Sequence, residues 1–291
     1  MIFCQRPVIF YPLRSEVALH RVQKKIMLTS TTLKDIMTTT HKKVAVVTGG
    51  AMGIGAEVVT KLAAEHFHVI ICDINADAAN AFCEELTAKG LAASTCHMDV
   101  SSPQSIDAAF TWIDKEFGRC DVLVNSAGIA KTMPFLEFDA DVFTKTMTIN
   151  VTGTFLCCQS AARLMKKNNA GRIINIASVA GLRAVGKGRT AYGTSKGAVI
   201  ALTRQMAVEL CEYGITANAV APGPVDTPMT KELHSDTFRQ AYSKAIPLGR
   251  YGLTSEIAGA VSYLASDSAA YVNGIVLPVD GGFLAWGAGD I

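Results

Sequence analysis

A tyrosine and a lysine four residues apart form the pair in this sequence best suited to proton transfer. Tyr192 and Lys196 lie in residues 190–212, whose apolar spacing predicts a helix, so both side chains share one helix face. A nearby ammonium stabilises a phenolate and lowers the pKa of tyrosine towards neutrality, where the phenol acts as a general acid or base. Ser178 follows an apolar run upstream, where its hydroxyl would reach a substrate oxygen. The three residues predict acid–base chemistry on an oxygen-bearing substrate.

A glycine-rich loop, Thr48–Gly55, joins a β-branched run to a predicted helix. Its glycines allow the backbone to approach a pyrophosphate, whose charge the free amides of a helix N-terminus would meet. The loop is not a P-loop, because no Gly-Lys-Ser/Thr follows the glycines. The spacing indicates a dinucleotide-binding turn, while a purely structural tight turn is the alternative for the glycines taken alone.

An acid after the second apolar run sharpens this interpretation. Asp73 lies twenty residues after Gly53, where a carboxylate accepts hydrogen bonds from both hydroxyls of an adenosine ribose. The same carboxylate repels a 2′-phosphate, and neither Met52, Ile74 nor Asn75 offers a cation to bind one. Loop and acid together predict NAD, rather than NADP, as the cofactor.

Short apolar runs alternate with helical patterns from Lys43 onward. This alternation predicts an α/β fold, a doubly wound Rossmann-type domain whose seven-stranded parallel sheet has helices on both faces. Ligands of such folds bind at the carboxyl ends of the strands, which is where the residues above lie. The expected strands are 43–48, 68–72, 92–97, 121–125, 172–177, 216–221 and 274–279, and the expected helices are 54–66, 76–89, 103–117, 140–167, 190–212 and 255–265.

The glycine loop, Asp73, Ser178 and the Tyr192–Lys196 pair follow one another in an order that resembles the short-chain dehydrogenase/reductase family. The resemblance extends over nearly all of residues 42–283. The resemblance implies that Tyr192 is the acid or base and that Lys196 holds the nicotinamide ribose and lowers the tyrosine pKa. It further implies that Ser178 polarises the carbonyl and that Asn150 holds a water in a proton relay. The matching elements are Thr48-Gly49-x-x-x-Gly53-x-Gly55, Asp99, Asn125-Ser-Ala-Gly128, Asn150, Ser178, Tyr192/Lys196, Pro222-Gly223 with Thr227, and Asp280-Gly281-Gly282.

The resemblance also implies a set of cofactor contacts and no metal site. Asp99 is expected to contact adenine, and Thr227 to bind the nicotinamide carboxamide. Asn125 and the Ala127–Gly128 backbone are expected to contact the cofactor as well. The expected set is Thr48, Gly49, Met52, Gly53, Ile54, Gly55, Asp73, Ile74, Asp99, Val100, Asn125, Ala127, Gly128, Tyr192, Lys196, Pro222, Gly223, Val225 and Thr227.

The reaction implied by the resemblance is hydride transfer between NAD and a secondary alcohol or ketone. A small polar alcohol such as a polyol or sugar is the leading substrate class. One alternative is a 3-oxoacyl reductase acting on acyl-carrier-protein or CoA thioesters, and another is a catalytically silent dinucleotide sensor. The resemblance further implies a homotetramer.

Three segments are expected to contact the small-molecule substrate: 129–135, 180–189 and a substrate loop at about 228–250. Lys187 and Arg189 either serve an acidic group or belong to a solvated basic loop. His234 is expected to be solvated.

Composition excludes several other classes of protein. The chain has 291 residues, of which 49% are apolar and 18% charged, with a net charge of +2. Residues 1–36 carry a net +4, so the remainder is slightly acidic and is not expected to bind nucleic acid. No apolar stretch reaches the length of a membrane span. Eight cysteines without a C-x-x-C pattern predict reduced thiols and a cytoplasmic location.

The first forty residues differ from the rest. Residues 1–40 are basic and rich in Ser and Thr, with no sustained apolar period. We expect an N-terminal extension that is poorly ordered or not native, with translation starting at Met27 or Met37, and a transit peptide as the alternative. Residues 41–291 are expected to form the dinucleotide-binding oxidoreductase domain.

Overall fold

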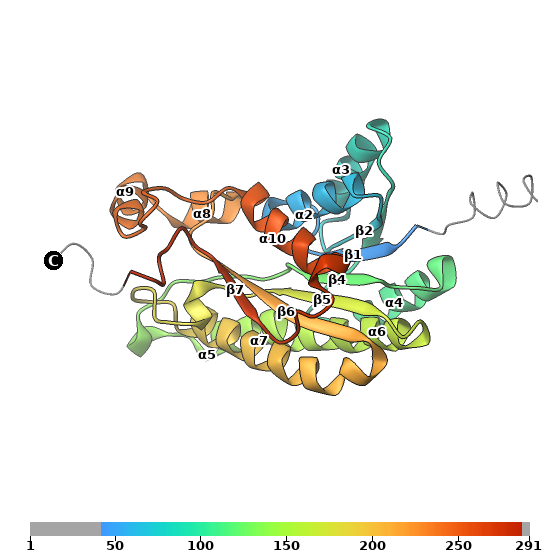
Figure 1. Cartoon of the computed structure of the whole chain (residues 1–291). Coiled ribbons are helices and arrows are strands. Elements are labelled where there is room, and N and C mark those ends of the chain that lie inside the picture. The colour runs from blue at the N-terminus through green and yellow to red at the C-terminus, as the bar shows by residue number, and fades with distance from the viewer. Residues whose placement is uncertain (1–41, 287–291) are drawn as a thin grey trace, which may run out of the picture. The chain divides into compact units, whose positions relative to one another are not determined.

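Seven parallel strands form one sheet in the order β3-β2-β1-β4-β5-β6-β7 (Figure 1). The computed structural model describes residues 42–286, so the expectations for residues 1–40 lie outside the described part. The order reverses between β1 and β4, as the doubly wound prediction requires. The strands are β1 (Val44–Thr48), β2 (His68–Asp73), β3 (Ala93–His97), β4 (Val122–Asn125), β5 (Gly171–Ile176), β6 (Ile215–Pro222) and β7 (Val276–Val279).

Helices cover both faces of the sheet, which confirms the predicted fold (Figure 1). In β1, Ala45 and Val47 pack on one face while Val44 and Val46 pack on the other, so the whole strand is buried. One face carries α2 (Gly53–Ala64), α3 (Ala76–Ala88) and α10 (Thr254–Ala265), and the other α4 (Pro103–Phe117), α5 (Ala140–Met147), α6 (Thr154–Lys167) and α7 (Thr190–Glu209).

The long helix expected at 140–167 contains a π-helical turn. Residues Thr148–Gly153 form this turn between α5 and α6, and Asn150 lies within it. A π turn inside an α-helix widens the backbone locally and often marks a functional site. The amphipathic pattern could not show the turn, because the pattern continues on both sides of it.

The expected substrate loop contains two short helices, α8 (Pro228–Leu233) and α9 (Asp236–Lys244). Tyr242 of α9 packs on aromatic residues of other segments, with its ring 5.4 Å from the Phe283 ring and 6.2 Å from the Tyr251 ring. This packing joins the segment to the end of the described chain. No helix among residues 42–286 has the length and hydropathy to cross a membrane, and the seven cysteines there are free thiols.

A buried polar network crosses the centre of the sheet. Asn125 donates to Asn175 over 2.8 Å, Asn175 donates to Thr203 over 2.9 Å, and Thr203 donates to the Val199 carbonyl over 2.7 Å. All three polar side chains are buried. The network joins β4, β5 and α7, three elements that carry site residues.

We predict that Asn175→Ala lowers the free energy of unfolding by about 2–3 kcal/mol, because it removes the partner of two buried polar groups. Urea unfolding measures the change. Asn168→Ala, at an exposed position, is the control and is expected to change stability by less than about 0.5 kcal/mol. If both substitutions changed the free energy of unfolding equally, the network would not stabilise the fold in the way proposed.

Candidate functional site

The glycine loop lies between β1 and α2 and has no room for side chains. At Gly49, where φ is +62°, an added Cβ would lie 2.8 Å from the Ala127 backbone. At Gly55, an added Cβ would overlap the Gly49 carbonyl. Helix α2 begins after Met52, which makes no side-chain capping bond, so its first amides have no side-chain partner. The loop therefore fits a pyrophosphate held by main-chain N–H groups.

Asp73 ends β2 beside this loop with its carboxylate already oriented. The amide of Ala51 donates to Oδ2 and the amide of Asn75 donates to Oδ1, each over 3.0 Å. Asp73 is buried, while Met52 and Ile74 expose 53% and 62% of their surfaces. No Lys or Arg of residues 42–286 forms an ion pair with Asp73. The acid thus lies at the carboxyl end of β2, where the sequence predicts the ribose contact, and no cation of residues 42–286 pairs with it.

The other expected cofactor contacts follow the strands β3, β4 and β6. Thr48 accepts bonds from the amides of Ser126 and Ala127, each over 3.2 Å, which ties the turn after β4 to β1. Hydrogen bonds from Ser101 hold the pKa of Asp99 below its usual range. Thr227 caps α8. Val100, Gly128, Pro222, Gly223 and Val225 lie in the segments that follow or end these strands.

Asn125 is placed differently from its neighbours. Its side-chain amide is buried in the network with Asn175 and also donates to the Cys158 sulfur over 3.1 Å. Oδ1 of Asn125 is buried without a hydrogen-bond partner in the described structure. The side-chain nitrogen therefore links β4 to Asn175 of β5 and Cys158 of α6, and the cofactor contact expected of Asn125 stays a prediction.

The four expected catalytic residues come together at the ends of β5 and α5 and the start of α7. Lys196 donates to the carbonyl of Ile176, at the end of β5, over 2.7 Å. Tyr192 is hydrogen-bonded to Ser178, and the Lys196 ammonium lies 5.8 Å from the tyrosine ring centre. Asn150 Nδ2 donates to the Ile129 carbonyl and Oδ1 accepts from the Ile129 amide, each over 2.9 Å.

Burial raises the pKa of Tyr192, and this corrects the expectation of a pKa near neutrality. The hydrogen bond from Ser178 and the charge of Arg189 both lower this pKa, but by less than burial raises it. Burial also lowers the pKa of Lys196 to about 8. The phenol therefore holds its proton at neutral pH in the absence of bound ligands, which suits it to act as an acid on a carbonyl oxygen.

Ser195 is a site residue that sequence reasoning missed. It is fully buried, accepts from Asn150 over 3.0 Å and donates to the Tyr192 carbonyl over 2.8 Å. These two bonds connect the π turn to α7 beside the catalytic tyrosine. No sequence signal distinguishes this serine from the many others that lie in helices.

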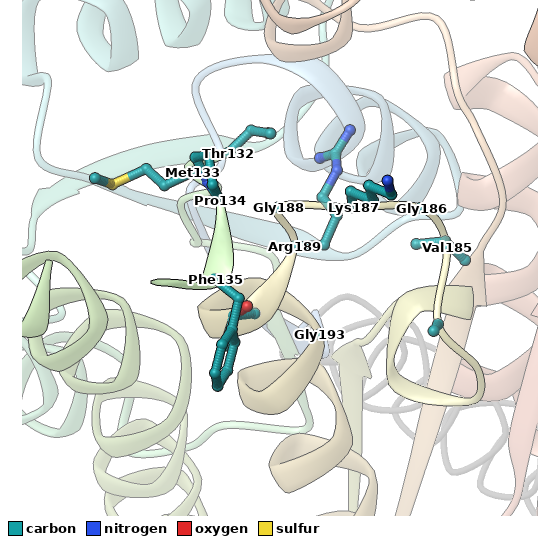
Figure 2. Close-up of a pocket in the computed structure, with 12 residues that line it drawn as sticks. Thr132, Met133, Pro134, Phe135, Val185, Gly186, Lys187, Gly188, Arg189 and Gly193 are labelled. Atoms are coloured by element: carbon teal, nitrogen blue, oxygen red, sulfur yellow. The ribbon is translucent and has the colours of Figure 1, made fainter. Parts of the chain in front are cut away.

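A cavity of about 700 Å³ lies between residues 132–135 and 184–190, and Gly193, the residue after Tyr192 in α7, also lines it (Figure 2). The amide of Met133 donates to the Gly188 carbonyl over 3.1 Å, which joins the two walls. Gly188 has φ of +76°, and an added Cβ would lie 2.7 Å from Thr132. Two of the three expected substrate segments therefore face one another. Lys187 and Arg189 bring positive charge to an otherwise mostly apolar lining.

His234 is buried, with only 7% of its surface exposed, so the expectation that it is solvated is wrong. Its Nε2 lies 2.8 Å from Nη2 of Arg189 and its Nδ1 lies 3.0 Å from the Tyr251 hydroxyl. Aromatic rings of Phe238 and Tyr242 cover it. The sequence did not show this, because the partners come from three separate segments.

Known proteins are similar to this chain over most of its length. A family model described as enoyl-(acyl carrier protein) reductase matches residues 49–284. The chain is 39% identical to the 3-oxoacyl-(acyl-carrier-protein) reductase of Aquifex aeolicus, over 82% of this chain and 96% of that protein. It is also 39% identical to the 5-keto-D-gluconate 5-reductase of Escherichia coli K12, over 87% and 99% respectively.

A solved structure agrees in fold as well as in sequence. The gluconate 5-dehydrogenase of Burkholderia cenocepacia J2315, crystallised with NADP and tartrate, superposes with a TM-score of 0.81 at 33% identity. The match covers 84% of this chain and 96% of that one. These proteins are oxidoreductases, and they differ in whether the substrate is a sugar acid or an acyl thioester.

We predict opposite pH dependences for the two directions of the reaction. Alcohol oxidation needs an unprotonated phenol and rises with pH, whereas ketone reduction needs the protonated form and falls. Ser178→Ala removes the hydrogen bond that lowers the pKa of Tyr192, so the rise in oxidation moves to higher pH. Initial rates across pH measure this shift.

Thr194→Ala is the control for this prediction, because Thr194 is an exposed hydroxyl residue two positions from Tyr192. Its pH profile is expected to match that of the unmodified protein. A Ser178→Ala profile with an unmoved midpoint would contradict the assigned hydrogen bond.

Proposed function

The chain belongs to the short-chain dehydrogenase/reductase family, and we propose that it interconverts a secondary alcohol and a ketone on a small polar substrate, a polyol or sugar, with NAD. The observation that carries the substrate class is Arg189, which lines the cavity and acts on Tyr192 by its charge, and which no carboxylate of residues 42–286 pairs. A guanidinium in such a place favours a substrate rich in oxygen atoms.

The protein's own part in the reaction is to move a proton and to orient the reactants. Bound nicotinamide supplies the hydride acceptor or donor. Tyr192 takes the proton of the alcohol during oxidation and returns it during reduction. Ser178 bonds the substrate oxygen, and Lys196 places its charge next to the tyrosine. Asn150 and Ser195 hold the surrounding backbone in place through the bonds described above.

Asp73 supports NAD as the cofactor. Its two oxygens are aimed by backbone amides, and burial of a fixed carboxylate at the ribose position disfavours a 2′-phosphate. The cofactor-binding residues proposed are those expected from the sequence, with Thr48 to Gly55 at the pyrophosphate and Asp73 at the adenosine ribose foremost among them. The gluconate 5-dehydrogenase structure contains NADP. The effect of Asp73 on the choice between NAD and NADP is therefore tested directly below.

A 3-oxoacyl-thioester reductase is the second candidate. Met133, Pro134, Phe135 and Val185 give the cavity apolar walls that suit an acyl chain. The Aquifex aeolicus relative also carries this activity in its name. Under either candidate, the substrate contacts proposed are 129–135, 180–189 and the loop at about 228–250.

We also propose a homotetramer. Phe155 on α6 and Val208 on α7 expose 42% and 72% of their surfaces on the helices that cover one face of the sheet. Burial of such apolar surface between copies of the chain would stabilise an oligomer.

We predict NADH formation from NAD with at least one polyol, sugar or sugar acid, and loss of at least about a hundredfold in kcat for Tyr192→Phe. The phenyl ring keeps the shape of the site but cannot exchange a proton. Absorbance at the NADH band measures turnover, and 3-hydroxyacyl thioesters in the same panel test the second candidate. NAD binding without turnover of any compound would overturn both candidates.

We predict that Asp73→Ser raises the KM for NAD about tenfold and lowers the KM for NADP, because it removes two ribose hydrogen bonds and a repelling charge. Steady-state kinetics with both cofactors measures the change. Asp77→Ser, an exposed acid in the first turn of α3, is the control and is expected to leave both KM values unchanged. A preference for NADP in the unmodified protein would contradict the proposed cofactor.

A further inference from the structure

The charge of Arg189 acts both on the wall of the cavity and on the tyrosine proposed as the acid or base. Arg189 comes from the loop just before α7, three residues ahead of Tyr192, and it lines the cavity (Figure 2). Its charge is close enough to lower the pKa of Tyr192 and of Tyr242. The side chain is half-buried, so water screens this charge less than it would on an open surface.

The partner of Arg189 is an uncharged imidazole. A guanidinium has no acceptor atom, so His234 Nε2 must accept the 2.8 Å hydrogen bond from Arg189 Nη2. The ring proton therefore sits on Nδ1 and is donated to the Tyr251 hydroxyl, 3.0 Å away. Burial and the charges of Arg189 and Arg239 lower the pKa of His234 to about 4. His234 consequently positions Arg189 at neutral pH without neutralising it.

His234 is itself held firmly. The Arg239 guanidinium lies 4.3 Å from the centre of the Tyr251 ring and donates to Asp226 over 3.1 Å. Asp226 directly precedes Thr227, the residue expected to contact the nicotinamide carboxamide. His234 is therefore connected through Tyr251 and Arg239 to Asp226, which lies next to the expected cofactor contact Thr227. A side chain fixed in this way loses little further conformational entropy when its partner binds a ligand.

Three facts indicate which chemical group the Arg189 guanidinium can bind. The only hydrogen bond of its side chain within residues 42–286 is the one to His234. No carboxylate of those residues is within ion-pairing distance. The guanidinium has five donor hydrogens, so several remain to bind an anionic group. A carboxylate matches a guanidinium better than a hydroxyl does, because its two oxygens accept two parallel charge-assisted bonds.

We propose that Arg189, oriented by the positioning residue His234, binds a carboxylate of the substrate, so that the preferred substrate is a hydroxy acid or the corresponding keto acid. This inference rests on the proposed function and narrows its substrate class. Arg189 is then a specificity-determining residue, since it touches the substrate away from the reacting carbon. His234 acts through Arg189 and does not touch the substrate.

A matched pair of compounds tests the proposal. D-gluconate and D-glucitol have the same six-carbon chain and differ at one end, where the first has a carboxylate and the second a hydroxymethyl group. The quantity to measure is the ratio of kcat/KM for gluconate over glucitol with saturating NAD. Calorimetric titration of each compound into the NADH complex gives a second ratio, which does not depend on turnover.

The unmodified protein is expected to prefer gluconate by at least tenfold in both ratios. Arg189→Met is expected to bring both ratios down to about one, because charge-assisted bonds of this strength account for roughly ten- to hundredfold in affinity. His234→Leu is expected to lower the ratios through a higher KM for gluconate. His234→Gln keeps an acceptor for Arg189 and is expected to restore most of the preference. Arg204→Met, an exposed arginine on α7, controls for overall charge.

The outcomes separate the two proposals. Equal affinities for gluconate and glucitol, or a preference that survives in Arg189→Met, would overturn the carboxylate assignment even if both compounds are oxidised. If His234→Gln lost the preference for gluconate as fully as His234→Leu does, the positioning role of His234 would be overturned. Turnover of neither compound, together with a binding preference lost in Arg189→Met, would overturn the oxidation of polyols and sugar acids but support the carboxylate site.

Discussion

The hydrogen bond from Lys196 to the Ile176 carbonyl joins the two elements on which the site is built. Lys196 is buried, and a buried ammonium is stable only when its donors have partners. Since the carbonyl belongs to the last residue of β5, the bond holds the start of α7 next to the carboxyl end of that strand. Tyr192 and Ser178 are then brought within hydrogen-bonding distance of one another. The cost of burying the charge is visible in the lowered pKa of Lys196.

Two kinds of surface meet at this point. The proposed cofactor side is mostly backbone, because at Gly49 and Gly55 the turn after β1 packs too closely on neighbouring main chain for any side chain. The substrate side is made by side chains on loops, which pack on one another through the Met133–Gly188 bond and the aromatic residues around His234. A backbone cradle recognises what all dinucleotides share, whereas side chains on loops determine which alcohol fits.

Much of the architecture follows from local pattern. The seven apolar runs and the helical periods predicted every strand and most helices within a few residues, because burial on both faces of a parallel sheet demands continuous apolar sequence. The π turn at Thr148–Gly153 was not predictable in this way. The side chain of Asn150 in this turn bonds Ile129 and Ser195, which lie 21 and 45 residues away in the chain.

The sequence by itself indicated the fold class, the glycine loop with Asp73, and the Tyr192–Lys196 pair with Ser178, because spacing within one helix or after one strand places each of them. Asn150 joined this set through the resemblance to the family. Tertiary structure decided the pKa of Tyr192, since burial outweighs the neighbouring groups only once the chain is packed. It also decided that His234 is buried and neutral and holds Arg189 at the cavity. These properties come from contacts between segments distant in sequence, and no local pattern records such contacts.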